Sequence, residues 1–212
     1  PRWISDRIGV ELGHKVSVVN LDGQPVTDAD LASFEVIQGL RKLDLNGTPV
    51  TDRGLAHLSG LADLEELQLR ETNVGDPGLR HLAGLDRLRA LYLYETKVGD
   101  PGMASLARLR SLEELSLSRT AVGDAGLSRL AALPSLKVLR LKGTCVTDAG
   151  LVHLAGMKNL ECHDLSETDV TDAGLVHLSG LAELRILFVD GSKVSKAGRL
   201  ALKRALPSAQ VY

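Results

Sequence analysis

Residues 64–79, LEELQLRETNVGDPGL, decide the fold, because the chain repeats this pattern seven times with small variations. The leading leucine returns every 24 residues without an insertion or deletion, at Leu40, Leu64, Leu88, Leu112, Leu136, Leu160 and Leu184. Counting back another 24 residues places a degenerate first unit at 16–37. A fixed period of this length is typical of a solenoid, whose units bury their apolar faces against each other. Functional residues must therefore be sought where the units differ, and we number the positions of each unit from its leading leucine.

The motif resembles the leucine-rich repeat. Residues 64–74 and 136–146 both read Leu-x-x-Leu-x-Leu-x-x-Thr-x-Val, and the tails at 147–151 and 171–175 are similar to the bacterial 24-residue subtype with Thr-Asp-Ala-Gly-Leu. The resemblance implies an α/β fold, a right-handed solenoid arc with a parallel β-sheet on its concave face and short helices on its convex face. Packing leads to the same shape, because strands lie ~4.8 Å apart and helices ~10 Å apart, so stacked units must curve with the strands inside. Proteins of this family mostly bind other proteins, but they share no common partner and no reaction.

The unbroken period predicts one elongated domain rather than two globular domains in the 212 residues. Residues 16–207 form eight repeats, and 208–212 restart the strand pattern as a terminal edge strand. Apolar residues at helix-like spacing in 1–15 predict an N-terminal cap over the open end of the first unit. The sequence starts without a methionine or a signal-type segment, so we expect it to be a piece of a longer protein.

Composition argues against several classes of partner. The formal charge is −2, with 25 basic and 27 acidic residues, so no whole-chain field attracts nucleic acid or anionic lipid. No apolar run approaches the ~18 residues of a membrane span, and we expect a monomer without membrane contact by this segment. Cys145 and Cys162, the only cysteines, are predicted to lie ~20 Å apart along the strand direction, too far for a disulfide. A reducing compartment such as the cytoplasm fits, as does a secreted domain without disulfides.

Residues that recur in every unit are predicted to be structural. Position 9 is threonine in six units, and its hydroxyl is expected to bond backbone groups at the bend after the strand. Position 13 is aspartate in seven units and precedes Pro77 and Pro101, so we predict that it is the N-cap of a short helix rather than a calcium ligand. Glycine at position 15 predicts close packing on a neighbouring backbone. Left-handed helix ends are predicted at four glycines of position 21, namely Gly60, Gly84, Gly156 and Gly180.

Histidine occurs at two kinds of position. Four histidines share helix position 18, but Ser105 and Arg129 interrupt the series and no carboxylate or thiol completes a ligand set, so we expect no metal and no cofactor. These four are His57, His81, His153 and His177. His163 instead takes an inward leucine position. It is either a core histidine bonded to the backbone or a pH-sensitive kink.

The outward positions of the predicted strands carry the individual information. Tyr92 and Tyr94 lie on one strand face at the centre of the arc, and a tyrosine and arginine patch of this kind is typical of interface hot spots. Glu71 and Glu95 place like charges on neighbouring strands, which costs stability unless a partner uses them. The predicted partner-binding residues are Gln68, Arg70, Glu71, Tyr92, Tyr94, Glu95, Ser116, Arg119, Arg140, Lys142 and Phe188.

Other classes of function fit less well. An enzyme needs a nucleophile–base pair or a carboxylate dyad in a concave site, and the pattern offers no such catalytic residues. Carboxylates around the two tyrosines repel phosphate, which argues against single-stranded nucleic acid. We therefore predict a non-enzymatic module that binds an unidentified protein or peptide on its concave sheet. The alternatives are a structural spacer, a substrate-recognition arm of a larger effector or membrane-anchored protein, and a consensus-like scaffold, against which the irregular first unit argues.

Overall fold

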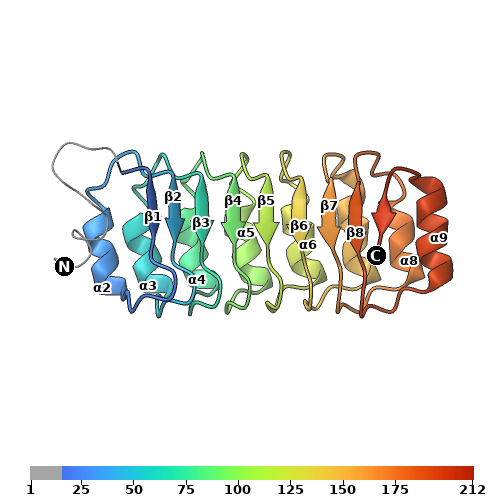
Figure 1. The fold of residues 1–212 in the computed structure, drawn as a ribbon, viewed down its shortest axis with the longest axis horizontal. Helices are drawn as coiled ribbons and strands as arrows, with labels where there is room; N and C mark the ends of the chain where they lie inside the picture. Colours follow the sequence, from blue (N-terminus) through green and yellow to red (C-terminus); the bar gives the residue numbers. More distant parts are fainter. Residues whose placement is uncertain (1–15) are drawn as a thin grey trace.

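The structure, a computed structural model, describes residues 16–212. Within these residues, nine short strands form one parallel sheet in sequence order, and a helical segment follows each of the first eight strands (Figure 1). Strands and helices form two layers that run side by side along the long axis, as the period predicted. The predicted cap at 1–15 lies outside the described residues.

The strands begin at position 3 of each unit, and in the parallel register each position pairs with the same position of the next unit. The last strand falls inside the predicted edge strand at 208–212. The strands are β1 (Val18–Asn20), β2 (Lys42–Asp44), β3 (Glu66–Gln68), β4 (Ala90–Tyr92), β5 (Glu114–Ser116), β6 (Val138–Arg140), β7 (Cys162–Asp164), β8 (Ile186–Phe188) and β9 (Gln210–Val211).

Short helical segments, which begin at position 13, return the chain to the next strand. The α-helices are α2 (Asp28–Leu31), α3 (Asp52–Leu55), α4 (Asp76–Leu79), α5 (Met103–Leu106), α6 (Asp124–Leu130), α7 (Asp148–Leu151), α8 (Asp172–Leu175) and α9 (Lys196–Ala205). The 3-10 segments are η1 (Ala32–Phe34), η2 (Ala56–Leu58), η3 (Arg80–Leu82), η4 (Asp100–Gly102), η5 (Val152–Gly156) and η6 (Val176–Leu178).

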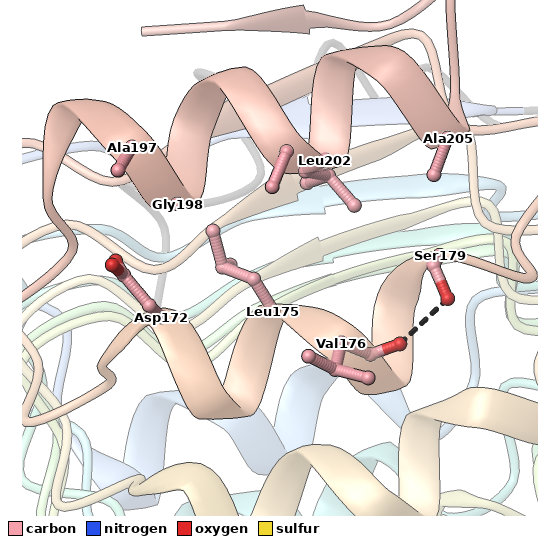
Figure 2. Close-up of a pocket in the computed structure, with 9 residues that line it drawn as sticks. Asp172, Leu175, Val176, Ser179, Ala197, Gly198, Leu202 and Ala205 are labelled. Atoms are coloured by element: carbon pink, nitrogen blue, oxygen red, sulfur yellow. Dashed lines mark hydrogen bonds between the residues drawn. The ribbon is translucent and has the colours of Figure 1, made fainter.

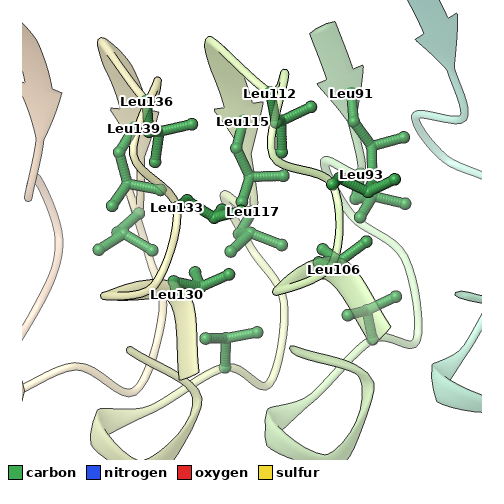
Figure 3. Packing of buried hydrophobic residues seen from close by; sticks show 14 of the residues in the cluster. Leu91, Leu93, Leu106, Leu112, Leu115, Leu117, Leu130, Leu133, Leu136 and Leu139 are labelled. Carbon is green, nitrogen blue, oxygen red and sulfur yellow. The ribbon is translucent and has the colours of Figure 1, made fainter. Parts of the chain in front are cut away.

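The core is a stack of similar, mostly leucine layers between the sheet and the helices. Leu91, Leu115 and Leu139 occupy position 4 of three successive units and are fully buried (Figure 3). Burying a leucine side chain contributes roughly 1.5–3 kcal/mol, and here each layer is covered only by its neighbours. Stability therefore belongs to the stack rather than to a single unit.

The threonines of position 9 form the predicted structural ladder. Thr120 is buried, and its hydroxyl donates to the carbonyl of Leu117 at 2.6 Å. The same bond, at 2.6–2.8 Å, recurs in the other five threonine units. The prediction is confirmed, since each hydroxyl satisfies a backbone carbonyl at the bend after the strand.

The prediction that aspartate is the helix N-cap is wrong. The N-cap is position 12, as in Thr147, whose hydroxyl accepts the N–H of Ala149 at 3.3 Å, and Asp148 is the first helical residue. The Asp148 carboxylate instead reaches into the next unit, where it accepts the backbone N–H of Thr171 at 2.7 Å and its hydroxyl at 2.6 Å. The carboxylate contact to the backbone N–H recurs from Asp28 to Asp172. We call it the aspartate staple, because it joins neighbouring units.

The staple also explains the glycine of position 15. A Cβ atom on Gly174 would lie 2.3 Å from Asp148 Oδ1. Close packing was correctly predicted, but the closest neighbouring atom belongs to a carboxylate rather than to the backbone. The prediction of left-handed glycines at position 21 is wrong. Among the described residues the glycines with positive φ are Gly23, Gly39, Gly47, Gly143 and Gly191.

Candidate functional site

The two tyrosines lie together at the centre of the concave sheet. Tyr92 is the last residue of β4 and pairs in register with Gln68 on β3 and Ser116 on β5. Tyr94 follows two residues later on the same face, because alternate residues of a strand point to the same side. Leu93, between them, is fully buried. Both tyrosines are half-buried, so each keeps part of its ring in solvent.

Tyr92 is held in a network of charged groups. The Arg70 guanidinium lies over the ring, 4.8 Å from its centroid. Burial, and then the charge and hydrogen bond of Glu114, raise the Tyr92 pKa to about 12, so the hydroxyl stays protonated and donates to that carboxylate. Arg140 in turn pairs with Glu114. This network fixes the orientation of the Tyr92 ring.

Two of the predicted binding residues are mostly engaged within the sheet. Gln68 accepts from the Asn46 amide at 2.8 Å and donates to Glu66 at 3.0 Å. Ser116 is only 5% exposed, so it lies in the floor between the side chains of neighbouring strands. These residues shape the sheet surface but offer little free hydrogen-bonding capacity to a partner.

Position 8 has a left-handed backbone that the sequence reading did not foresee. Four units place glycine there, namely Gly23, Gly47, Gly143 and Gly191. The other four place charged residues there with φ of 55–57°, namely Glu71, Glu95, Arg119 and Glu167. A non-glycine residue in this region costs roughly 1–2 kcal/mol, because its Cβ approaches the following carbonyl oxygen.

Arg119 and Glu167 are satisfied within the chain. Arg119 reaches across the intervening unit to Glu167 at 3.5 Å, and Lys142 approaches the same carboxylate at 3.2 Å. Gly143 sits beneath this bridge, where a Cβ would lie 3.4 Å from the Arg119 side chain. The predicted cations Arg119 and Lys142 are therefore partly neutralised by an acidic residue absent from the predicted set.

Glu71 and Glu95 have no such compensation. Both are exposed, they occupy the same position of adjacent units, and neither forms an ion pair with any of residues 16–212. Desolvation, then a hydrogen bond with Glu95, raises the Tyr94 pKa. The two carboxylates thus border the tyrosines on a strained backbone.

Phe188 lies at the C-terminal end of the concave face, four strands from Tyr92. Its ring stacks on Tyr212, with centroids 5.3 Å apart and planes 20° from parallel. Tyr212 follows β9. The sequence predicted only a terminal edge strand there, so Tyr212 was not among the predicted binding residues. The predicted residues therefore form a central group around the tyrosines and a separate group near Phe188.

His163 is a core histidine, as one of the two interpretations predicted. It is fully buried, and Nδ1 lies 2.7 Å from the carbonyl oxygen of Leu139, to which it must donate. Nε2 has no hydrogen-bond partner among residues 16–212, and burial lowers the pKa of the ring to about 4. The register from Leu139 through His163 to Leu187 is regular, so β7 is not kinked.

Within residues 16–212, no group of three or more His, Cys, Asp or Glu side chains is arranged to hold a metal ion. One position-18 histidine, His57, contacts Glu35 Oε1 at 2.5 Å. Cys145 and Cys162 are both free thiols, as their predicted separation requires. In this part of the chain no helix is long and apolar enough to cross a membrane.

A groove of about 330 Å³ lies on the convex face between α8–η6 and α9 (Figure 2). It opens because Ala201 and Ala205 occupy positions 18 and 22, where the other full units have longer side chains. Its carboxylate, Asp172, is already engaged in the staple with Ser195, at 2.7 Å to the N–H and 2.6 Å to the hydroxyl. We interpret the groove as a packing feature of the last unit.

Comparisons with known proteins agree with the repeat architecture of the chain. Four stretches, 38–59, 61–83, 108–131 and 132–155, match a family model described as Leucine Rich repeat. The fold is that of a leucine-rich repeat protein. The assignment to the bacterial 24-residue subtype stays a prediction. A search of curated protein sequences returned no match.

Solved leucine-rich repeat structures superpose over most of the chain. Internalin C2 of Listeria monocytogenes is 24% identical with a TM-score of 0.73, covering 93% of this chain and 81% of that one. The protein LIC12759 of Leptospira interrogans is 19% identical with a TM-score of 0.73, covering 93% and 48%. The ectodomain of the Arabidopsis thaliana receptor kinase GASSHO1/SCHENGEN3, solved in complex with CASPARIAN STRIP INTEGRITY FACTOR 2, is 18% identical with a TM-score of 0.58, covering 88% and 25%. At these identities the likeness supports the fold alone.

Proposed function

We propose that this leucine-rich repeat chain is a non-enzymatic module that binds a protein, or an extended segment of one, on its concave sheet. Tyr92 and Tyr94 are its central anchors. Arg70, which forms no ion pair with the described residues, is the cation that remains available beside them. The interaction is made by a monomer and involves neither nucleic acid nor membrane.

The observation that carries this proposal is the state of Glu71 and Glu95. Both are held at positive φ, both are exposed, and they stack like charges on adjacent units without an ion pair. Each of these features costs stability, and no ion pair with residues 16–212 offsets them. Strain of this kind persists where function requires the side chain, so the two carboxylates are available to cations of a partner.

The tyrosines supply the apolar contact area. Both tyrosines are half-buried, and Tyr92 is fixed by Arg70 and Glu114. A rigid aromatic ring loses little conformational entropy on binding, which is why Tyr and Arg dominate interface hot spots. The carboxylates along the same face favour a protein partner over phosphate-bearing ligands.

Leucine-rich repeat proteins typically mediate protein–protein interactions, and one of the structures that superpose here was solved as a complex with CASPARIAN STRIP INTEGRITY FACTOR 2. This analogy raises the expectation of a binding role without indicating a partner. The alternative is a structural spacer, in which the tyrosines are tolerated surface residues. The two functions differ in what the concave face retains from a cell extract.

The test is affinity capture from cells of the source organism with three immobilised proteins: wild type, Tyr92→Ala/Tyr94→Ala, and a convex control, Val152→Ala/Val176→Ala. Val152 and Val176 are 50% and 66% exposed, so the control shortens two exposed apolar side chains on the opposite face. We expect a partner retained by wild type and control but lost by the tyrosine variant, at matched melting temperature. Equal retention by all three proteins, or retention of no partner by any, would support the spacer.

A further inference from the structure

The concave face has a hollow at some distance from the tyrosines. A cavity of about 370 Å³ opens over β7 and β8, next to the end of β6. It is lined by Lys142, Asp164, Ser166, Glu167, Phe188, Asp190 and Gly191. The aromatic wall is Phe188, whose register partner is Asp164 on β7. Because Tyr212 stacks on the side toward β9, the opposite face of the Phe188 ring looks toward Asp164 and the cavity.

Of the three carboxylates that line the cavity, Glu167 and Asp190 are paired with cations, whereas Asp164 forms no ion pair with the described residues. Three carboxylates line the cavity against one amine, and Lys142 is already paired with Glu167 at 3.2 Å. Asp190 pairs with Arg199, whose Nη1 and Nη2 both lie 3.4 Å from Oδ1, and Arg199 is not among the residues that line the cavity. Asp164 accepts the N–H of Ser166 at 2.9 Å and forms no ion pair with the described residues. The ring face toward the cavity is therefore flanked by the unpaired carboxylate of Asp164 and by Asp190, whose Oδ2 accepts no hydrogen bond from the described residues.

We propose that this cavity accepts an arginine side chain of the bound partner, with its guanidinium over the free face of Phe188 and between Asp164 and Asp190. A planar cation that stacks on an aromatic face while donating to carboxylates on both sides is what guanidinium provides and ammonium matches less well. This inference rests on the proposed function, because it assigns the chemistry of a partner that lies along the concave sheet.

The fold also sets the spacing of the two elements in the partner. Tyr92 on β4 and Phe188 on β8 are four strand intervals apart, which corresponds to ~19 Å at ~4.8 Å per interval. An extended segment advances ~3.3 Å per residue. The arginine is thus expected about six residues from the residue that packs on the tyrosines.

A small probe tests the cavity without knowledge of the partner. The ¹H–¹⁵N spectrum of the full chain is titrated with acetyl-arginine amide, and in parallel with acetyl-citrulline amide, which has nearly the same shape without the charge. We expect saturable shifts at Asp164, Glu167, Phe188 and Asp190 with the arginine compound and at least tenfold weaker binding of the citrulline compound. Equal response to both compounds, or no localised response, would overturn the proposal.

Variants at the cavity have a matched control in the second unit. Asp164→Asn keeps the acceptor for the Ser166 N–H but removes the charge, and Asp44→Asn makes the same change at the same repeat position, where Asp44 accepts the Asn46 N–H at 3.0 Å. We expect Asp164→Asn and Phe188→Leu to weaken arginine binding at least tenfold and Asp44→Asn to leave it unchanged. Wild-type affinity in Asp164→Asn would contradict the proposal.

The two proposals fail separately. If capture of a partner depends on the tyrosines but acetyl-arginine amide causes no localised shifts, the arginine site is wrong and the concave binding function stands. If the probe binds as expected but capture is the same with the tyrosine variant, the cavity is real and the anchor assignment is wrong.

Discussion

Glu71 and Glu95 adopt the same left-handed backbone as Arg119 and Glu167, yet only the second pair is satisfied inside the chain. Arg119 and Glu167 bridge a glycine unit and meet at 3.5 Å, whereas the two glutamates stand side by side without a cation. Both pairs bear the same backbone strain. The difference teaches that strain alone does not mark function, and that the informative residues are those whose strain and charge are both uncompensated.

The aspartate staple is the opposite extreme, because the same contact recurs from Asp28 to Asp172. If this contact holds the units together, a small change at it should cost much stability. In Gly150→Ala the new Cβ would lie 2.3 Å from Asp124 Oδ1, which accepts the Thr147 N–H at 2.8 Å. We expect a loss of roughly 2–3 kcal/mol in the free energy of unfolding, measured by urea denaturation, since the staple must break or the units must separate.

Gly156→Ala is the matched control, because a Cβ there meets no atom within 4 Å and its φ is not positive. The same measurement should give no loss, or a gain of up to about 1 kcal/mol from the reduced entropy of the unfolded chain. Equal effects of the two substitutions would mean that the aspartate staple does not hold the units together.

His163 sharpens the comparison, since it departs from the repeat consensus but has no surface through which to act. We expect His163→Leu to raise the free energy of unfolding at pH 7 by about 1–3 kcal/mol, because it removes an unpaired buried nitrogen and restores the leucine of the other units. The check is chemical denaturation of both proteins at matched ionic strength.

The advantage of His163→Leu should grow as the solution is acidified. The ring pKa in the folded state is about 4, below its ordinary value of 6.5. Above pH 6.5 the histidine is therefore neutral in both the folded and the unfolded chain, and its protonation does not lower the free energy of unfolding. As pH falls from 6.5 toward 4, the unfolded chain binds the proton first and wild type loses about 3 kcal/mol relative to the variant. A constant difference between the two proteins from pH 7 to 4 would contradict this protonation scheme.

The smallest changes in stability are expected at position 8, where the backbone is left-handed. Glu71→Gly and Glu95→Gly should each raise the free energy of unfolding by about 0.5–1 kcal/mol, because glycine relieves the left-handed strain and removes a like charge. Arg119→Gly should gain less, since it also loses the Glu167 pair. If Arg119→Gly raises the free energy of unfolding as much as the glutamate variants do, the ion pair with Glu167 does not offset the backbone strain at Arg119.

Much of this architecture could be predicted from the period alone. The strands, the leucine layers and the threonine ladder follow from residues that repeat every 24 positions, and Tyr92 and Tyr94 were correctly placed on one face. The aspartate staple could not be assigned, because in a regular repeat a contact within a unit and a contact with the next unit leave the same pattern. Pro77 suggested the first helical position, whereas it is the second.

The candidate site was harder to predict where charged side chains from different units pair with each other. The glycines at position 8 were the one available signal of a left-handed backbone, and their alternation with Glu71, Glu95, Arg119 and Glu167 concealed it. That Arg119 reaches Glu167 across the intervening unit depends on side-chain length and on the absence of a side chain at Gly143. Such contacts follow from the curvature and spacing of the stack rather than from any local motif.

The most direct test of the central claim is the dissociation constant of the captured partner for wild type, Tyr92→Ala/Tyr94→Ala and the convex control Val152→Ala/Val176→Ala, measured by calorimetry. Two hot-spot residues worth about 2 kcal/mol each predict a loss of at least ~100-fold for the tyrosine variant and less than ~2-fold for the control. A tyrosine variant that binds within ~2-fold of wild type, or a convex control that loses more than the tyrosine variant, would contradict the assignment of the binding site to the concave sheet.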